Sequence, residues 1–451
     1  MYLSHFGAVS SKTAVVSSCE DETMPGRNAE KHTKRSQRPW PLPETSPQTE
    51  FKGPAAIISR RAADRIRSGH IWVYQSDIEQ IVGEPLGLLP VADHRGIPLG
   101  TALYSPASQI TLRFVSTDLI NHQQWLNLLQ ARLQSAIRMR LPMLSAETNA
   151  CRLVFSEADA LPGIIADKYN DLVILQLLTK ALDNDEVRSL AVAVLTGELS
   201  PRAIVERPDP RIRELEQLST PAANPLYAAD TESPPLSTDF LLNGLLFHYD
   251  ANAGQKTGAF LDQRENYAAA ARHAHGEALD VCTYQGGFAL HLAQACPLVT
   301  GVDISRAALE VAERNLAANA KRLQASNVDW IEADAFDLLR DWSMSGAVYD
   351  TIVLDPPAFA KSKRAVEGAL RGYKELNLRA LKMLRPGGIL VTCSCSHHVA
   401  LADFQQIVAT AAGDAGRRVR LIERRGAAAD HPVILTIPET EYLKCLICSV
   451  E

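Results

Sequence analysis

The C-terminal part of the chain alternates between apolar runs and helix patterns, and this alternation limits its fold more than any other feature. Five apolar runs are expected to form strands: EALDV, LVTGVD, NVDWIEAD, YDTIVLD and GGILVTCS. Alternation of strands and helices predicts an α/β fold with a doubly wound, mostly parallel sheet. Ligands of such sheets bind beyond the carboxyl ends of the strands. Polar residues follow all five runs, so residues 251–451 are expected to carry the functional site.

The loop after the first run distinguishes between nucleotide ligands. It contains Gly286 and Gly287, which let a backbone approach a ligand closely. It lacks the G-x-G-x-x-G spacing that holds a dinucleotide pyrophosphate. Asp303, at the end of the second run, is placed to bind a ribose diol, and Asp334 follows the third run, where it is expected to meet an adenine amino group. A diol-binding acid without a diphosphate site favours S-adenosylmethionine (SAM) as the ligand.

The fourth run ends in the sequence Asp355-Pro356-Pro357-Ala358-Phe359. Two prolines stop the strand and hold a stiff loop, because their φ angles are fixed. Backbone carbonyls in such a loop can accept hydrogen bonds from a base amino group, and Phe359 can stack on a flipped base. The motif indicates methylation of a base or another planar substrate. It does not by itself identify the methylated atom.

The fifth run ends in two thiols and two imidazoles, in the order C-S-C-S-H-H. Methylation of an unactivated pyrimidine carbon-5 requires a thiolate that first attacks carbon-6. Cys395, flanked by serines, is the expected nucleophile, whereas Cys393 is expected to be a small packing residue. A zinc site is disfavoured because the ligands are crowded and no second pair has the usual spacing. The C-L-I-C sequence near the C-terminus is expected to be strand core.

The remaining sequence divides into three parts. Residues 1–51 are polar and without apolar periodicity, which predicts a disordered leader. Residues 52–118 contain short apolar runs between turn signals, which predicts a small β-barrel. Residues 119–250 predict a central α/β domain that includes a Pro-rich linker and a hairpin with Asn-Gly at its tip. On the barrel's basic helix, Arg60 and Arg61 are candidate phosphate contacts, although a solvated helix face explains the same charge equally well.

The charge balance restricts how such a chain can bind nucleic acid. The 46 Lys and Arg residues and 52 Asp and Glu residues give a net charge of −6. Binding by bulk positive charge is therefore excluded, and any contact with RNA must be local. No signal peptide or transmembrane run is evident, and eight cysteines are too few for a disulfide scaffold in a chain of 451 residues. We expect a cytoplasmic protein with reduced thiols.

Several motifs in order resemble a known family. They are SGHIWVYQSDI, SPASQITLRF, SEADALPGIIADKYND, ERPDPRIRELE, GQKTGAFLDQREN, DVCTYQGGFALHLA, GVDISRAAL, DPPAFAKSK and SCSHHV. The chain from residue 54 onward is similar to SAM-dependent large-subunit ribosomal RNA methyltransferases of the cytosine-5 RlmI type. The resemblance implies a PUA RNA-binding domain, a central EEHEE-type α/β domain, a Rossmann-like class I methyltransferase domain and SAM as methyl donor.

The resemblance also implies roles for individual residues. Asp355 would contact ring nitrogen 3 of the base that Cys395 attacks, and Pro356, Pro357 and Phe359 would receive that base. The implied donor-binding residues are Gln263, Arg264, Asp280, Tyr284, Gly286, Phe288, Asp303, Ile304, Asp334 and Ala335. The implied partner is large-subunit ribosomal RNA, with no metal and no membrane. The assembly state is left open, a homodimer included.

Three functions are weighed. The leading hypothesis is a methyltransferase that forms 5-methylcytosine in 23S-type ribosomal RNA through a covalent cysteine adduct. The alternative on the same fold is methylation of an exocyclic or ring nitrogen, in which Cys395 only packs. A third hypothesis is a non-catalytic RNA-binding protein of ribosome assembly, which would not bind SAM.

Overall fold

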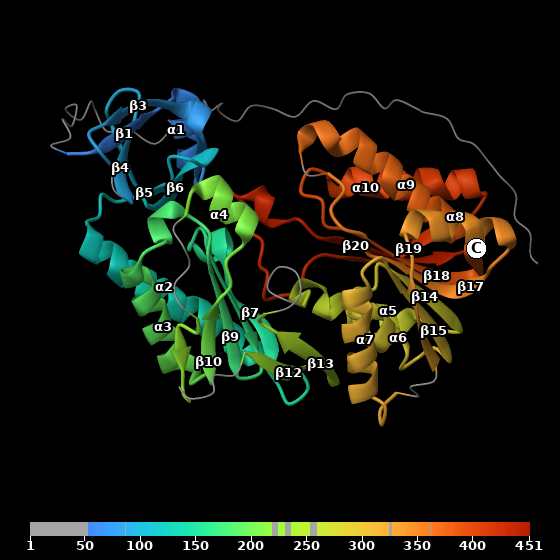
Figure 1. Ribbon diagram of the computed structural model, residues 1–451. Coiled ribbons are helices and arrows are strands. Elements are labelled where there is room, and N and C mark those ends of the chain that lie inside the picture. The colour runs from blue at the N-terminus through green and yellow to red at the C-terminus, as the bar shows by residue number, and fades with distance from the viewer. Residues whose placement is uncertain are drawn as a thin grey trace, which may run out of the picture. The chain divides into compact units, whose positions relative to one another are not determined.

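The computed structural model describes residues 53–85, 87–218, 224–230, 236–252, 259–323, 327–360 and 362–451. The predicted leader, residues 1–51, lies outside these ranges, as do parts of the Pro-rich linker and the whole G-Q-K-T-G segment. Four sheets follow one another along the described chain (Figure 1). Within these residues, no helix combines the length and the apolar character needed to cross a membrane.

The first sheet forms the predicted β-barrel region, with strand order β2-β6-β5-β4-β1-β3. Its elements are β1 (Ala55–Ile58), α1 (Arg60–Arg67), β2 (Trp72–Tyr74), β3 (Ile78–Val82), β4 (Leu88–Asp93), β5 (Pro98–Tyr104) and β6 (Ile110–Ser116). Helix α1 begins at Ser59, whose hydroxyl accepts a hydrogen bond from the backbone N–H of Ala62. Small alanines on its inner face let the helix pack closely on the apolar side chains of the sheet.

The second sheet belongs to the central domain, with strand order β11-β10-β9-β8-β7. Helices α2 and α3 pack their apolar faces on it and share one core with it. The elements are α2 (His122–Arg140), β7 (Ala150–Phe155), β8 (Ile164–Tyr169), β9 (Leu172–Leu177), α3 (Asp185–Leu199), β10 (Ala203–Glu206), α4 (Pro210–Glu216) and β11 (Tyr227–Ala228). The predicted hairpin is present as β12 (Ser237–Leu242) and β13 (Leu245–Asp250), and Asn243 and Gly244 both have positive φ at its tip.

The C-terminal sheet has the order β16-β15-β14-β17-β18-β20-β19. Its strands are β14 (Glu277–Val281), β15 (Leu298–Asp303), β16 (Val328–Glu332), β17 (Tyr349–Leu354), β18 (Leu384–Ser394), β19 (Val419–Arg425) and β20 (Lys444–Val450). The five predicted strands pair in parallel, and β20 joins β18 and β19 in antiparallel fashion. The doubly wound α/β sheet is therefore as predicted, and β19 is an addition to it.

Helices cover both faces of this sheet (Figure 1). They are α5 (Arg264–His273), α6 (Gly287–Leu292), α7 (Arg306–Ala318), α8 (Ala335–Ser345), α9 (Val366–Met383) and α10 (Leu401–Ala415). Successive strand residues point to opposite faces, so Ala278 packs with α5 and α6 while Leu279 packs with α8, α9 and α10. The helices bury the strands on both faces, whereas the carboxyl ends of the strands remain available to form the functional site.

A buried charge cluster joins the central domain to the loop before β20. The carboxylate of Asp430 is fully buried and accepts hydrogen bonds from Arg264 Nη1 (3.1 Å) and from the backbone N–H of Arg152 (2.9 Å). Burial alone would raise the pKa of Asp430, but the hydrogen bond and charge of His431 and the charge of Arg264 lower it to about 2. The ionised carboxylate therefore stabilises the folded state.

Asp430→Asn should lower the free energy of unfolding by roughly 3 kcal/mol, because it leaves buried Arg264 with only the exposed and more distant Glu265 as a counter-charge. The folded-state pKa of Asp430 lies below its usual value, so this contribution is present above that value. It is lost as the pH falls from about 4 toward 2. Urea unfolding at neutral and acidic pH measures both effects. Asp414→Asn is the control, since the exposed Asp414–Lys374 pair should contribute less than about 1 kcal/mol; an equal loss in both variants would contradict the assignment.

Candidate active site

The loop between β14 and α6 is built around the buried carboxylate of Asp280. Its Oδ2 accepts hydrogen bonds from Thr283 Oγ1 (2.5 Å) and from the backbone N–H of Ala289 (2.8 Å). Its Oδ1 is buried and has no hydrogen-bond partner among the described atoms. Burial, opposed by these two hydrogen bonds, raises the pKa of Asp280 to about 7. The site therefore holds an acceptor that a cationic ligand group would satisfy.

This lack of a partner sets Asp280 apart from the other buried acids of the described chain. Each of the others forms a salt bridge, with arginine in every case. These acids are Asp77, Asp93, Asp167, Glu206, Glu216 and Asp430. A buried carboxylate that lacks a charged partner is destabilising unless something else compensates it. The ammonium of the methionine moiety of SAM has the chemistry to do so.

The adenosine side of the candidate site lies at the adjacent ends of β15 and β16. Asp303 Oδ2 accepts a hydrogen bond from the backbone N–H of Tyr284 (2.9 Å), which holds the first loop against the second strand. Ile304 follows with 69% of its surface exposed, which is unusual for a large apolar side chain. Asp334 caps α8 through the N–H groups of Phe336 and Asp337, and Ala335 begins that helix. A carboxylate, an uncovered apolar side chain and a second acid fit a ribose and an adenine.

The acceptor side lies at the ends of β17 and β18. Gln263 Nε2 donates a hydrogen bond to Asp355 Oδ1 (3.0 Å), and Pro356 is buried while Pro357 is exposed. Cys395 Sγ lies 3.9 Å from the carbonyl oxygen of Pro356. The structure thus brings the predicted nucleophile into contact with the predicted base-receiving loop.

Phe359 packs against two other aromatic side chains. Its ring centroid is 4.7 Å from that of Tyr373 and 5.8 Å from that of Phe336. The hydroxyl groups of Tyr373 and Ser396 are hydrogen-bonded (2.9 Å), and Ser396 Oγ accepts from the backbone N–H of Ala360 (3.2 Å). These contacts tie the loop after β17 to the loop after β18.

Other predicted site residues have different surroundings. The Arg264 side chain turns away from Asp355 and pairs with Asp430, and Phe288 is buried against Tyr267. Gly286 has a φ of 83°, and a Cβ there would lie 2.9 Å from the ring of Trp330. The glycine is therefore required by backbone conformation and by packing, in addition to any approach of a ligand. The buried position of Cys393 opposite Cys445 matches the packing interpretation.

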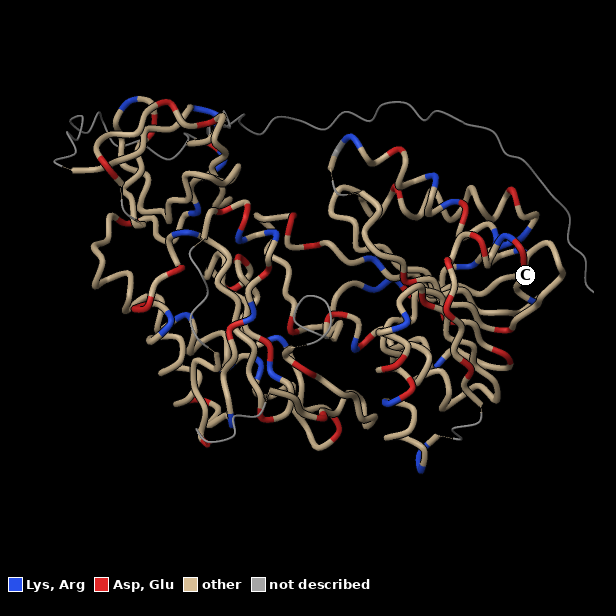
Figure 2. The backbone as a smooth tube through the Cα atoms, in the orientation of Figure 1, with Lys and Arg blue, Asp and Glu red and all other residues tan. Residues whose placement is uncertain are grey.

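The arginines of α1 are only partly available to a phosphate. Arg61 donates to buried Asp77 at 2.6 Å, although most of its side chain is exposed. Arg60 faces solvent and is 3.9 Å from Asp64. Lys and Arg are interspersed with Asp and Glu over the described elements (Figure 2). The helix that looked basic in the sequence is thus largely charge-compensated.

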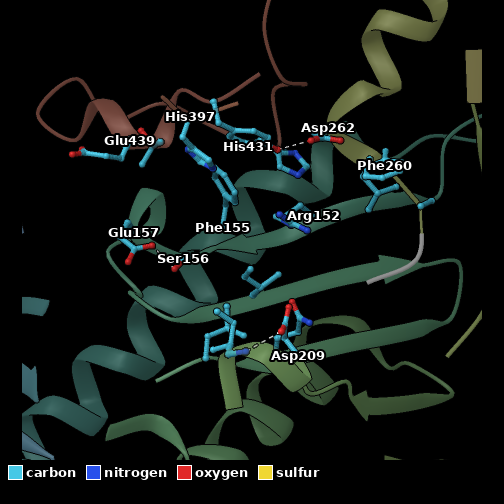
Figure 3. Close-up of a pocket in the computed structure, with 18 of the residues that line it drawn as sticks. Arg152, Phe155, Ser156, Glu157, Asp209, Phe260, Asp262, His397, His431 and Glu439 are labelled. Atoms are coloured by element: carbon cyan, nitrogen blue, oxygen red, sulfur yellow. Dashed lines mark hydrogen bonds between the residues drawn. The ribbon is translucent and has the colours of Figure 1, made fainter. Parts of the chain in front are cut away.

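A cavity of about 450 Å³ lies beside the acceptor site. Its walls come from the first sheet, the central domain and the C-terminal loops, and they include Trp72, Arg152, Phe155, His397 and Tyr442. The rings of His397 and Tyr442 are stacked with centroids 5.3 Å apart, and Phe155 lies 5.0 Å from His431. Figure 3 shows Phe155, His397 and His431 together on one side of the cavity and Asp209 on the other. Flat rings of this kind can stack on a nucleobase.

Sequence reasoning missed Lys444, Tyr442 and Asp262. Tyr442 Oη donates a hydrogen bond to Asp262 Oδ2 (2.5 Å), and Lys444 Nζ donates to the carbonyl of Ser396 (2.7 Å). All three lie in segments that come together only when β20 inserts beside β18. The one signal was a lysine at the start of an otherwise apolar run, K-C-L-I-C-S-V.

Comparison with known proteins agrees with this geometry. Residues 56–117 match the model of a PUA-like domain, and residues 219–439 match that of an S-adenosylmethionine-dependent methyltransferase. A crystal structure of a SAM-dependent methyltransferase from Streptococcus mutans is similar in fold, with a TM-score of 0.73, 20% identity, and coverage of 87% of this chain and 99% of that one. A methyltransferase crystallised with S-adenosylhomocysteine gives a TM-score of 0.74 at the same identity and coverage. Fold and site together define a class I SAM-dependent methyltransferase with a PUA-like domain.

Curated relatives narrow this class to a family. A ribosomal RNA large subunit methyltransferase I of Pseudoalteromonas translucida is 37% identical over 88% of this chain and 99% of its own. Proteins of the same name from Klebsiella pneumoniae and Shewanella amazonensis are 35% and 38% identical over 89% and 84% of this chain, and over 100% and 95% of their own lengths. The chain belongs to the ribosomal RNA large subunit methyltransferase I family, and its methyl donor is SAM.

Asp280→Asn should weaken SAM binding by about tenfold or more, because a charge-assisted hydrogen bond is worth about 1.5–3 kcal/mol. The carboxylate must be ionised to bind an ammonium. Affinity of the wild type should therefore fall as the pH drops through about 7, whereas the variant should be insensitive to pH in that range. Calorimetric titration with SAM measures both. Asp329→Asn, an exposed acid on neighbouring β16, is the control, and equal affinities in all three proteins would refute the role of Asp280.

Proposed function

We propose that this protein methylates carbon-5 of a cytosine in large-subunit ribosomal RNA through a covalent adduct with Cys395. The observation that carries the proposal is the 3.9 Å contact between Cys395 Sγ and the Pro356 carbonyl oxygen. It supports a thiol at the edge of the loop where a base would lie. The names of the curated relatives supply the RNA class. We also propose that residues 52–118 bind RNA for the methyltransferase domain, 251–451, and that the protein acts in the cytoplasm.

In the proposed reaction, the Cys395 thiolate adds to carbon-6 of the cytosine, which makes carbon-5 nucleophilic. Bound SAM supplies an electrophilic methyl group and leaves as S-adenosylhomocysteine. A base then removes the carbon-5 proton, the sulfur–carbon bond breaks, and the thiolate returns. Asp355 would contact ring nitrogen 3 by donating from its carboxylic acid form, since that nitrogen is an acceptor, and the hydrogen bond from Gln263 orients the carboxyl group. Pro356, Pro357 and Phe359 would hold the base plane.

The donor would lie across the ends of β14, β15 and β16. We assign the methionine side to Asp280, Tyr284 and Gly286, the ribose to Asp303, and the adenine to Ile304, Asp334 and Ala335. Two contacts support this arrangement: Tyr284 N–H binds Asp303, and the backbone N–H of Ala333 binds the Asp303 carbonyl (3.0 Å). These two hydrogen bonds hold the segments after β14, β15 and β16 next to one another, so a single extended ligand can span them.

Cys395→Ser should keep SAM affinity and abolish methyl transfer, because a serine hydroxyl is a poor nucleophile for carbon-6. Transfer of labelled methyl groups to large-subunit ribosomal RNA measures activity. Cys393→Ala, two residues earlier in β18, is the matched control and should remain active. Full activity of Cys395→Ser would exclude the covalent route.

The methylated nucleoside itself distinguishes the alternatives. Mass analysis of digested RNA should detect 5-methylcytidine when the protein has acted on the RNA and not when the protein is absent. An N-methylated nucleoside would favour the alternative in which Cys395 only packs against the Pro356 carbonyl. Absence of both SAM binding and methyl transfer would favour a non-catalytic role in ribosome assembly.

RNA binding should weaken with salt, because phosphate contacts release counterions. For a single strand, log K should fall by about 0.7 per log unit of salt for each phosphate contacted. Because α1 is largely charge-compensated, we expect log K to fall only shallowly with log salt. Arg60→Ala should reduce this slope by the contribution of about one phosphate contact. Filter binding of ribosomal RNA fragments at several salt concentrations measures the slope. An unchanged slope in the variant would remove Arg60 from the interface.

A further inference from the structure

Lys444 is a buried ammonium that lacks a carboxylate partner. Its residue is only 4% exposed, and Nζ donates hydrogen bonds to the backbone carbonyls of Ser396 and Tyr442, both at 2.7 Å. None of the salt bridges among the described residues includes it. Burial of an ammonium that is met only by neutral acceptors is destabilising. An ammonium has three N–H donors, and the two carbonyls use two of them.

The position of Lys444 relates it directly to Cys395. In the antiparallel pair of β18 and β20, Lys444 lies opposite Ser394, the residue before Cys395. Its side chain then reaches the carbonyl of Ser396, the residue after Cys395. Lys444 therefore contacts the residues on both sides of Cys395: Ser394 by backbone pairing and Ser396 by a side-chain hydrogen bond. A change at Lys444 would act on the segment that carries the nucleophile.

The charged groups around Lys444 also link it to Cys395. Burial lowers the pKa of Lys444 to about 8, and the charges of Cys395 and of exposed Glu441 oppose this lowering. The charge of Cys395 also acts on Tyr373 and Tyr442, whose pKa values burial raises, so both phenols are neutral near pH 7. Asp355, beside Pro356, is an acid and would disfavour a thiolate. Lys444 is thus a buried cation whose charge interacts with that of Cys395.

We propose that Lys444 is a positioning residue that stabilises the thiolate form of Cys395 before the base arrives. The thiol proton is released to solvent, and the ammonium keeps its own proton. The proposal rests on the proposed function for the identity of the nucleophile. It adds that the lysine at the start of β20 supplies the opposite charge that a neutral carbonyl environment lacks.

Alkylation of Cys395 by iodoacetamide tests this coupling in the full-length protein without RNA. Peptide mass spectrometry follows the rate at Cys395 from acidic to alkaline pH, since the thiolate is the reacting form. Wild-type Cys395 should reach half its maximal rate below the usual thiol pKa of about 8.5. Lys444→Met should move that midpoint upward and slow alkylation near pH 7 by about tenfold. The maximal rate at alkaline pH should be the same in both proteins.

The controls separate charge from structure. Lys444→Arg keeps the charge and should retain most of the wild-type profile, and Lys374→Met removes an exposed cation of α9 without effect. A merely structural lysine would change the maximal rate and leave the midpoint in place. That result, or an ordinary thiol midpoint in the wild type, would overturn the proposal. Because no RNA is present, the assay gives its answer whether or not Cys395→Ser abolishes methylation, so the two proposals fail separately.

Discussion

Parallel pairing of β14, β17 and β18 is the constraint on which the site depends. Val281 pairs with Leu354, and Leu354 pairs with Thr392, so the three strands end at one level. The loops that follow therefore start side by side and carry residues proposed to bind the donor, the Asp355 loop and Cys395. Hydrogen bonds from Gln263 to Asp355 and from Ala360 to Ser396 then hold these loops together. A shift of register in either pair would separate the thiol from the base-receiving loop.

The parts of the site that could be predicted follow directly from this constraint. An apolar run followed by a polar residue identifies a strand end, and parallel strands bring such ends together. Asp303, Asp355 and Cys395 were proposed in this way, whereas Asp280 was implied by the family resemblance. The hairpin at Asn243 was equally accessible, because its turn chemistry is local. What these features share is that each is determined by a few neighbouring residues.

The parts that could not be predicted depend on contacts between distant segments. Lys444 reaches the site because β20 runs antiparallel to β18, which brings the start of one strand to the end of the other. The family resemblance implied a donor-binding role for Arg264, and its side chain is paired with buried Asp430. Arg61, a candidate phosphate contact, also pairs with buried Asp77, which its sequence position did not indicate. Sequence spacing does not reveal which buried acid a given arginine will meet.

The distribution of buried charge explains why these pairings matter for function. Arginines compensate the buried acids of the first sheet and the central domain, and three of them, Arg113, Arg152 and Arg188, are themselves largely buried. Among the described residues of the C-terminal domain, buried Asp280, in the loop proposed to hold the donor, and buried Lys444, near Cys395, have no salt-bridge partner. An uncompensated charge lowers stability, and natural proteins keep such strain at sites of function. The two exceptions flank the place where a methyl group would pass from donor to base, one suited to a cation and the other to a thiolate.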